Sequence, residues 1–154
     1  MHAQPAEVPL TPKLVAALYT EAMLLADEAR SYFDGVGREE RDSLPPMERV
    51  GFSCESLKVT TRLMHVIAWL LTQRALEAGE ISPAQAKAPA RRLGEAPESD
   101  PAVVRRLPET ASALIEASRD LYARVQRFEG GGLQTGEPVA SPARSLMSRL
   151  ERSL

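Results

Sequence analysis

The chain has 154 residues, of which 26% are charged, a net charge of −2 at pH 7 and one cysteine. This length suits one domain with short extensions, and the near-balanced charge leaves no broad basic surface for a phosphate backbone, so general nucleic-acid binding is disfavoured. The single cysteine, Cys54, excludes an intrachain disulfide, and residues 1–10 lack the apolar segment of a secretory signal. We therefore expect a cytoplasmic protein.

The first helix is predicted over residues 12–34, after a loose N-terminal arm at residues 1–10. Thr11 can cap this helix, Pro12 suits its first position, and Gly35 follows its end. Apolar side chains recur there at helical spacing and predict its core face: Leu14, Leu18, Ala22, Leu25, Ala29 and Tyr32. Tyr19, Met23 and Leu24 lie off that stripe.

A second helix is predicted over residues 46–78, after a link rich in glycine and charge. Pro46 suits its first turn, and Gly79 follows its end. Its predicted core stripe is Val50, Cys54, Leu57, Thr61, Met64, Ala68, Leu71 and Ala75. From Thr61 to Leu76 the helix is apolar on nearly every side, which is typical of a helix buried in a bundle or between subunits.

The remaining sequence predicts a loop, a third helix and a tail. Residues 80–101 contain four prolines and exclude any long element. A third apolar stripe is interrupted by Pro108 and predicts a helix over residues 108–129, ended by the glycines that follow it. The stripe consists of Val104, Leu107, Ala111, Leu114, Ser118, Leu121, Val125 and Phe128. Residues 130–154 then read as a flexible linker and a short amphipathic helix, whose apolar side carries Leu146, Met147 and Leu150.

Three amphipathic helices without an alternating segment predict an all-α fold, an antiparallel three-helix bundle over residues 11–129 with a flexible tail. Two neighbours can cover only about half of the second helix, so its surplus apolar side chains should need a second subunit. We therefore expect a homodimer whose interface contains Tyr19, Met23, Leu24, Val59, Val66, Trp69 and Leu70.

No pattern of reactive residues predicts an enzyme. His65 has no carboxylate or cysteine one turn away, and Cys54 on the predicted core stripe should behave as a small hydrophobic residue. His2 and His65 are too far apart in sequence to suggest a metal site. We expect no catalytic residue, metal or cofactor, and neither a nucleic-acid partner nor membrane insertion.

Four segments resemble a known family in order and spacing: ARSYFDG, TRLMHVIAWLLTQRAL, GEIS and SRDLYARV. They are similar to the alphaproteobacterial RcdA family, regulators of CtrA degradation, and the resemblance covers about Leu14 to Phe128. It implies a dimeric three-helix bundle that acts as a proteolytic adaptor in the cytoplasm, including at a cell pole. It also implies four partners: the ClpXP protease, its primer CpdR, the cyclic-di-GMP-binding protein PopA, and the substrate CtrA.

Two segments are candidates for binding such partners. The first is the end of the first helix and the link that follows, with Tyr32, Phe33, Asp34, Arg38 and Arg41, although both aromatic residues also suit a core. The second is the tail, with Leu146, Met147 and Leu150. Two other functions stay open at this point: a structural dimerisation module, and a transcriptional accessory protein without a protease link.

Overall fold

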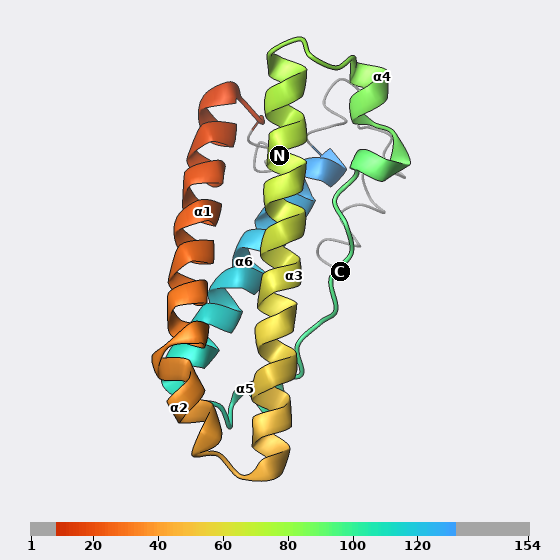
Figure 1. Cartoon of the computed structure of the whole chain (residues 1–154). Helices are drawn as coiled ribbons and strands as arrows, with labels where there is room; N and C mark the ends of the chain where they lie inside the picture. The colour runs from red at the N-terminus through yellow and green to blue at the C-terminus, as the bar shows by residue number, and fades with distance from the viewer. Residues whose placement is uncertain (1–8, 132–154) are drawn as a thin grey trace, which may run out of the picture.

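The computed structural model describes residues 9–131, and every regular element in that range is a helix (Figure 1). Three helices are long: α1 (Pro12–Asp34), α3 (Pro46–Glu77) and α6 (Glu109–Gly131). The short elements are α2 (Val36–Asp42), α4 (Pro83–Ala86), the 3-10 helix η1 (Pro89–Arg91) and α5 (Pro101–Val104). The predicted all-α class is confirmed for the described residues; residues 1–8 and 132–154 lie outside them.

Prolines and a side-chain cap set where the long helices begin. Thr11 Oγ1 accepts a hydrogen bond from the Leu14 N–H at 3.1 Å, and Pro12 occupies the first turn of α1. Pro46 begins α3 in the same way, and α6 begins directly after Pro108. Proline is tolerated in the first turn, where its missing N–H is not needed. At its other end α6 continues to Gly131, past the point at which the sequence analysis ended it.

The link between α1 and α3 is mostly helical, whereas the sequence analysis expected an irregular connection. Residues Val36–Asp42 form α2, which packs against the ends of both long helices. Gly37 permits this packing, because a Cβ atom at that position would lie 2.6 Å from the Tyr32 carbonyl oxygen. The close approach places the charged side chains of α2 next to the end of α1.

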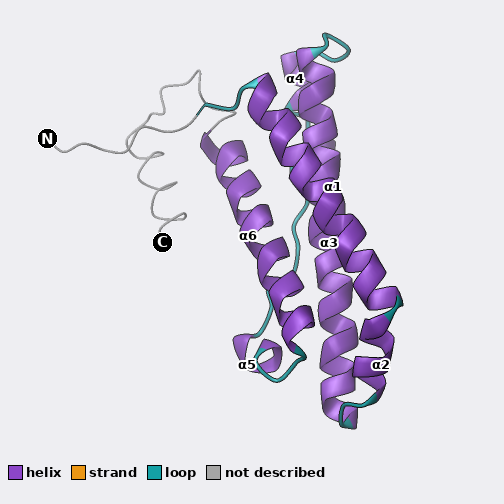
Figure 2. Cartoon of the chain, turned by 90° about the vertical axis from the view of Figure 1, so that its left-hand side faces the viewer, coloured by secondary structure: helices purple, strands orange, loops and turns teal. Residues whose placement is uncertain are grey.

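Helices α3 and α6 run in the same direction, which corrects the antiparallel arrangement predicted for all three helices. Figures 1 and 2 show α1 running one way and both α3 and α6 running the other. The chain between them, residues 78–108, returns along the length of the molecule, and we call it the long connector. Its prolines exclude a long helix and favour this extended path.

A hydrogen bond and an ion pair attach the long connector to the neighbouring long helices. Lys58 Nζ of α3 donates to the Glu98 carbonyl of the long connector at 2.8 Å. Towards the end of α6, Arg92 approaches the Glu129 carboxylate at 3.7 Å. The middle of the long connector is therefore attached to α3 through Glu98 and to α6 through Arg92.

The core lies where the three long helices meet. α1 buries Val15, Leu18, Ala22, Leu25 and Ala29, and α6 buries Ala111, Leu114, Ile115, Leu121 and Val125. These buried positions of α6 belong to the stripe predicted for the third helix, except Ile115, which the prediction did not include. The buried positions of α1 likewise follow the predicted stripe and its neighbour Val15.

Helix α3, in contrast, turns towards the core the side opposite to the one predicted. Its buried apolar side chains are Phe52, Val59, Leu63, Val66, Trp69 and Leu70, whereas Leu57 and Met64 of the predicted core stripe are 67% and 63% exposed. The expectation that Val59, Val66, Trp69 and Leu70 stay uncovered in a single chain is therefore wrong. The reason is that the long connector and α6 both pack against α3, so more of its circumference is covered than two helices alone would cover.

Buried polar groups explain this reversal. The Arg62 guanidinium donates to Ser118 Oγ at 3.1 Å, to the Pro97 carbonyl at 3.2 Å and to Ser99 Oγ at 2.6 Å. Ser99 Oγ in turn donates to the buried Glu55 carboxylate. Burial lowers the pKa of the Arg62 guanidinium, and the nearby Glu55 charge acts in the opposite direction. Because each of these groups has a partner, a helix side that carries charged residues can face the core.

Candidate docking face

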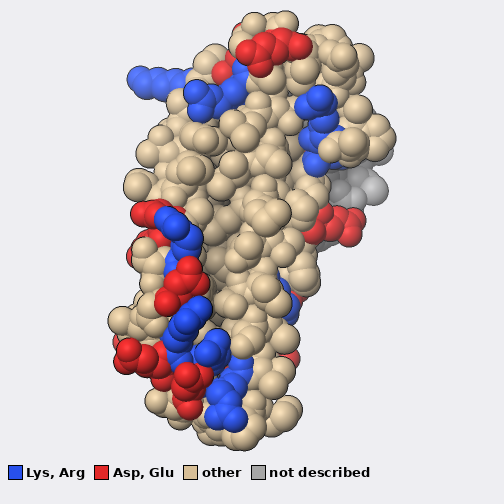
Figure 3. All heavy atoms as spheres, in the orientation of Figure 1, with Lys and Arg blue, Asp and Glu red and all other residues tan. Residues whose placement is uncertain are grey.

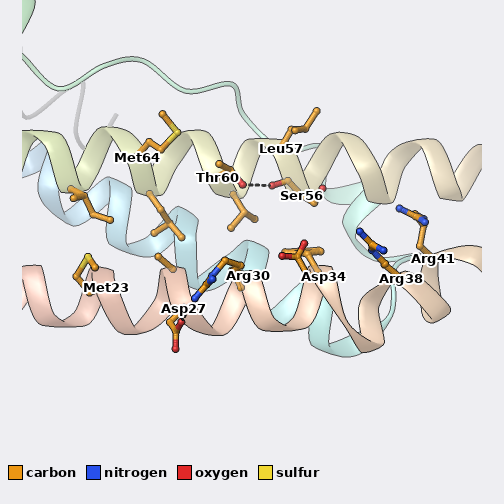
Figure 4. Close-up of a pocket in the computed structure, with 16 residues that line it drawn as sticks. Met23, Asp27, Arg30, Asp34, Arg38, Arg41, Ser56, Leu57, Thr60 and Met64 are labelled. Atoms are coloured by element: carbon orange, nitrogen blue, oxygen red, sulfur yellow. Dashed lines mark hydrogen bonds and ion pairs between the residues drawn. The ribbon is translucent and has the colours of Figure 1, made fainter.

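A groove of about 570 Å³ runs between α1 and α3 (Figure 4). Met23 and Met64 line its apolar half, and Ser56 and Thr60 line the α3 wall nearer its middle. The other half is charged and is lined by Asp27, Arg30, Asp34, Arg38 and Arg41. The apolar half of such a groove can hold the apolar side of a protein segment. The charged half favours partners whose charges are complementary to it.

The charged end of the groove carries side chains that remain accessible. Arg30 pairs with Asp27 at 2.8 Å, and Arg41 pairs with Asp42 at 3.0 Å. Exposed ion pairs of this kind contribute little to stability, so a partner can replace them at low cost. The sequence analysis proposed Asp34, Arg38 and Arg41 for partner binding. All three line this charged end of the groove.

The two aromatic residues proposed with them have a different environment. Tyr32 and Phe33 are half-buried, and their ring centroids lie 6.3 Å and 5.5 Å from that of Phe52 on α3. The Tyr32 hydroxyl donates a hydrogen bond to the Glu40 carboxylate, and burial together with this bond raises the pKa of Tyr32. These rings join α1, α2 and α3, and they support the groove more than they face a partner.

The exposed side of α3 carries apolar and uncharged residues along most of its length. We call eight of them the α3 seam: Val50, Cys54, Leu57, Thr61, Met64, Ala68, Leu71 and Ala75. Of these, only Thr61 and Ala75 are half-buried, and the other six are exposed. The charged residues between Arg49 and Arg74 lie on the covered side and are Glu55, Lys58 and Arg62. Figure 3 shows the corresponding face, with uncharged side chains across its centre and charged side chains towards its margins.

The α3 seam corrects two assignments from the sequence. Cys54 is exposed and does not lie in the core. The seam as a whole is surface, although the sequence analysis assigned it to the core. The largest apolar side chains of α3, Phe52 and Trp69, lie on the opposite side, but Glu55 and Arg62 on that same side made it resemble a solvent-facing surface.

A second groove, of about 370 Å³, lies on the other side of the α3 seam. Leu71 and Ala75 of the seam line it together with Trp69, and Arg91 and Arg92 of the long connector form its far wall. The seam is therefore a ridge of side chains between two grooves. Leu57 and Met64 project from α3 on the side away from α1 in Figure 4.

The α1 residues predicted for a dimer interface lie in three environments. Tyr19 is half-buried, with the Arg74 guanidinium 4.9 Å above its ring centroid. Met23 lines the groove, and Leu24 is 66% exposed. The tail candidates Leu146, Met147 and Leu150 lie outside the described residues.

Within residues 9–131, no group of three or more His, Cys, Asp or Glu side chains could hold a metal ion. None of the helices in the same range is long and apolar enough to cross a membrane.

Comparisons with known proteins give a family and a structural relative. The family model described as "Protein of unknown function (DUF1465)" matches residues 7–154. The crystal structure of RcdA from Caulobacter crescentus CB15 is 34% identical in sequence, with a TM-score of 0.63, over 77% of this chain and 90% of that chain. No curated protein matches.

Proposed function

This chain belongs to the DUF1465 family and is a homologue of RcdA, and from that premise we propose that it is a non-enzymatic adaptor in regulated proteolysis. In this role it brings cell-cycle substrates, such as CtrA, to the primed ClpXP protease in the cytoplasm. The observation that carries the proposal is an exposed, uncharged helix side next to a groove with one charged end, on a chain 34% identical to RcdA.

The three long helices serve in this proposal as one three-helix bundle that presents docking surfaces at fixed positions. The aromatic contacts of Tyr32, Phe33 and Phe52 fix α1 against α3, and the hydrogen bond from the Tyr32 hydroxyl to Glu40 holds α2 beside them. This limits the loss of conformational entropy when a partner binds α2. We expect the bundle to act as a homodimer, which presents each docking surface twice and raises the apparent affinity for a dimeric or clustered partner.

The charged end of the groove is our choice for the contact with CpdR or with the protease that CpdR has primed. Asp34, Arg38 and Arg41 are close together there, and none of them is needed to satisfy a buried group in residues 9–131. PopA and the substrates would then use other surfaces, including the tail. This division would let primer and substrate bind the same molecule together.

A reconstituted degradation reaction tests the function. ClpXP, CpdR, PopA with cyclic-di-GMP, and CtrA are combined with and without this protein, and the rate of CtrA loss is followed. We expect the protein to accelerate that loss only when CpdR is present. The variant Arg38→Glu/Arg41→Glu should weaken CpdR-dependent binding by about tenfold, the equivalent of about 1.4 kcal/mol.

A matched control separates a specific contact from a change in overall charge. Arg105→Glu/Arg106→Glu makes the same change in net charge at two exposed positions outside the groove, and it should leave the rate unchanged. If neither protease nor primer binds the wild-type protein, the adaptor function is wrong. Capture of DNA would then indicate the transcriptional accessory protein, and self-association alone would indicate the dimerisation module.

A further inference from the structure

The second groove has an apolar side and a basic side. α3 forms the apolar side, and η1 with the residue that follows it in the long connector forms the basic side. The residues that line the groove are Ala68, Trp69, Leu71, Thr72, Ala75, Ala90, Arg91 and Arg92. The three alanines leave the space of about 370 Å³. Sites for small ligands have volumes of about 300–1,000 Å³, so this groove suits a few side chains of a partner.

The backbone around the two arginines holds them in place. Pro89, at the start of η1, has a restricted φ angle, and its carbonyl accepts a hydrogen bond from the Arg92 N–H at 3.3 Å. One residue further on, the Leu93 N–H donates to the buried Glu129 carboxylate of α6 at 2.7 Å. Arg91 and Arg92 are therefore presented from a fixed segment, which reduces the conformational entropy lost when a partner binds.

The positive charges of the groove lack close partners. Among residues 9–131, Arg91 forms no ion pair, and Arg92 forms one, with Glu129 at 3.7 Å. Both arginines are exposed, and Figure 3 shows Lys and Arg side chains between the upper part of α3 and α4. Each guanidinium has five N–H donors, and two neighbouring positive charges repel each other. An anionic group in the groove would accept these hydrogen bonds and offset the repulsion.

We propose that the second groove binds a short segment of a partner protein in which acidic residues adjoin a bulky apolar residue. The apolar side chain lies against Ala68, Leu71 and Ala75, and the carboxylates pair with Arg91 and Arg92. Arginine and carboxylate can form two parallel hydrogen bonds, which fixes the orientation of the segment. The adaptor would thereby gain a docking site separate from the groove between α1 and α3, and this biological role rests on the proposed function.

Charge disfavours the other possible occupants. Residues 132–154 contain three arginines and two glutamates, so the net side-chain charge of the tail has the same sign as the groove wall. The α3 seam of a second copy contains no charged residue and offers no partner to the arginines. A nucleic acid binds through many phosphate contacts, which two arginines on a chain with a net charge of −2 do not supply.

A library of short random peptides displayed on phage tests which sequences this protein selects. The bait is the purified full-length chain, without protease or primer. We expect the enriched peptides to combine Asp or Glu with Leu, Ile or Phe. Enrichment of neutral or basic peptides, or no enrichment at all, would overturn the proposal.

Fluorescence anisotropy then tests whether the most enriched peptide, carrying a fluorescein label, binds in the second groove. Arg91→Glu/Arg92→Glu should raise its dissociation constant on the order of 100-fold, because attraction becomes repulsion. The matched control is Arg105→Glu/Arg106→Glu, which makes the same change in charge at another exposed pair of adjacent arginines in the long connector and should leave the constant unchanged. Equal dissociation constants for the two variants would contradict binding in this groove.

Two additional measurements separate the groove from charge alone. Ala90→Trp fills the groove without changing the charge and should weaken binding by about tenfold, whereas Ala84→Trp, at an exposed alanine outside the groove, should not. A peptide with lysines in place of its acidic residues should bind Arg91→Glu/Arg92→Glu more tightly than the wild type. If Ala90→Trp binds as tightly as Ala84→Trp, or if the lysine peptide shows no such preference, the proposal is wrong.

These measurements are independent of the degradation reaction. A chain that accelerates CtrA loss but selects no acidic peptide would keep the adaptor function and lose the second groove as a docking site. A chain that binds the peptide through Arg91 and Arg92 but does not accelerate CtrA loss would keep the docking site and lose the adaptor function.

Discussion

Most amphipathic helices cover their apolar side and expose their charged side. On α3, by contrast, charged residues lie on the covered side and an apolar stripe is exposed. The covered side contains the charged residues Glu55 and Arg62 as well as Trp69, whereas the α3 seam on the exposed side contains Leu57 and Met64 and no charged residue. Burial of a charged group costs several kcal/mol unless it is paired and hydrogen-bonded. The long connector and α6 supply those partners through Ser99 and Ser118. The available partners, more than the polarity of the side chains, therefore decide which side of α3 is covered.

The largest expected effect comes from removing the main apolar side chain of the covered side. Trp69 is 2% exposed, and Trp69→Ala should lower the free energy of unfolding by about 3–5 kcal/mol. Leu57→Ala, on the exposed side of the same helix, should change it by less than about 1 kcal/mol. Urea unfolding at a low protein concentration, where self-association does not contribute, measures both values. Similar losses for the two variants would contradict the assignment of the two sides.

The next effect concerns the buried polar groups. Arg62→Ala removes three hydrogen bonds and leaves the Glu55 carboxylate buried with fewer compensating charges, which should cost about 3 kcal/mol. Arg119→Ala is the matched control, because Arg119 pairs with Glu98 and Glu116 near the surface and should cost under about 1 kcal/mol. If thermal unfolding shows equal costs, then partners do not explain why this side of α3 is covered.

A smaller effect tests how closely the long connector packs against α3. A Cβ atom at Gly94 would lie 2.3 Å from His65 Nδ1, so Gly94→Ala should cost about 1–3 kcal/mol. The double variant Gly94→Ala/His65→Ala should recover most of that loss, because the clash is then absent. Gly130→Ala has open space around its Cβ atom and should not destabilise the chain. A loss in Gly94→Ala that persists in the double variant would point to backbone strain in place of the contact with His65.

The smallest effect depends on pH and concerns Tyr32, which packs against Phe52 at the end of the covered side. Its raised pKa means that the folded chain keeps the phenol proton to a higher pH than the unfolded chain, whose tyrosines ionise near pH 10. The stabilisation is therefore complete below pH 10 and is lost as the pH rises further. Tyr122 also has a raised pKa and adds to this loss. Melting temperatures between pH 9 and pH 11 should consequently fall less steeply in Tyr32→Phe than in the wild type; an unchanged slope would show that Tyr32 does not contribute.

Local signals in the sequence were sufficient for the positions of the long helices. Thr11 with Pro12, Pro46 and Pro108 mark helix starts through effects that act within one turn. The charged end of the groove was also within reach, because Asp34, Arg38 and Arg41 are close in sequence as well as in space. Features of this kind depend only on neighbouring residues.

The side of α3 that faces the core could not be found in the same way. The partners of Arg62 are Ser99 and Ser118, 37 and 56 residues further along the chain. Hydrophobic periodicity counts Arg62 and Glu55 as solvent-facing, because it cannot include hydrogen bonds to distant residues. The direction of α6 depends in turn on the path of the long connector, which no local pattern predicts.

The parallel direction of α3 and α6 also has a consequence for the order of folding. α1, α2 and α3 are joined by short turns, so their contacts close small loops, whereas contacts such as Arg62 with Ser118 span 56 residues. Closing the larger loop costs more entropy and slows the step that depends on it. We therefore expect α1 and α3 to associate first, also during synthesis, and the long connector and α6 to dock afterwards. Until they do, Val66 and Trp69 are open to water, and a nascent chain is most exposed to aggregation in that interval.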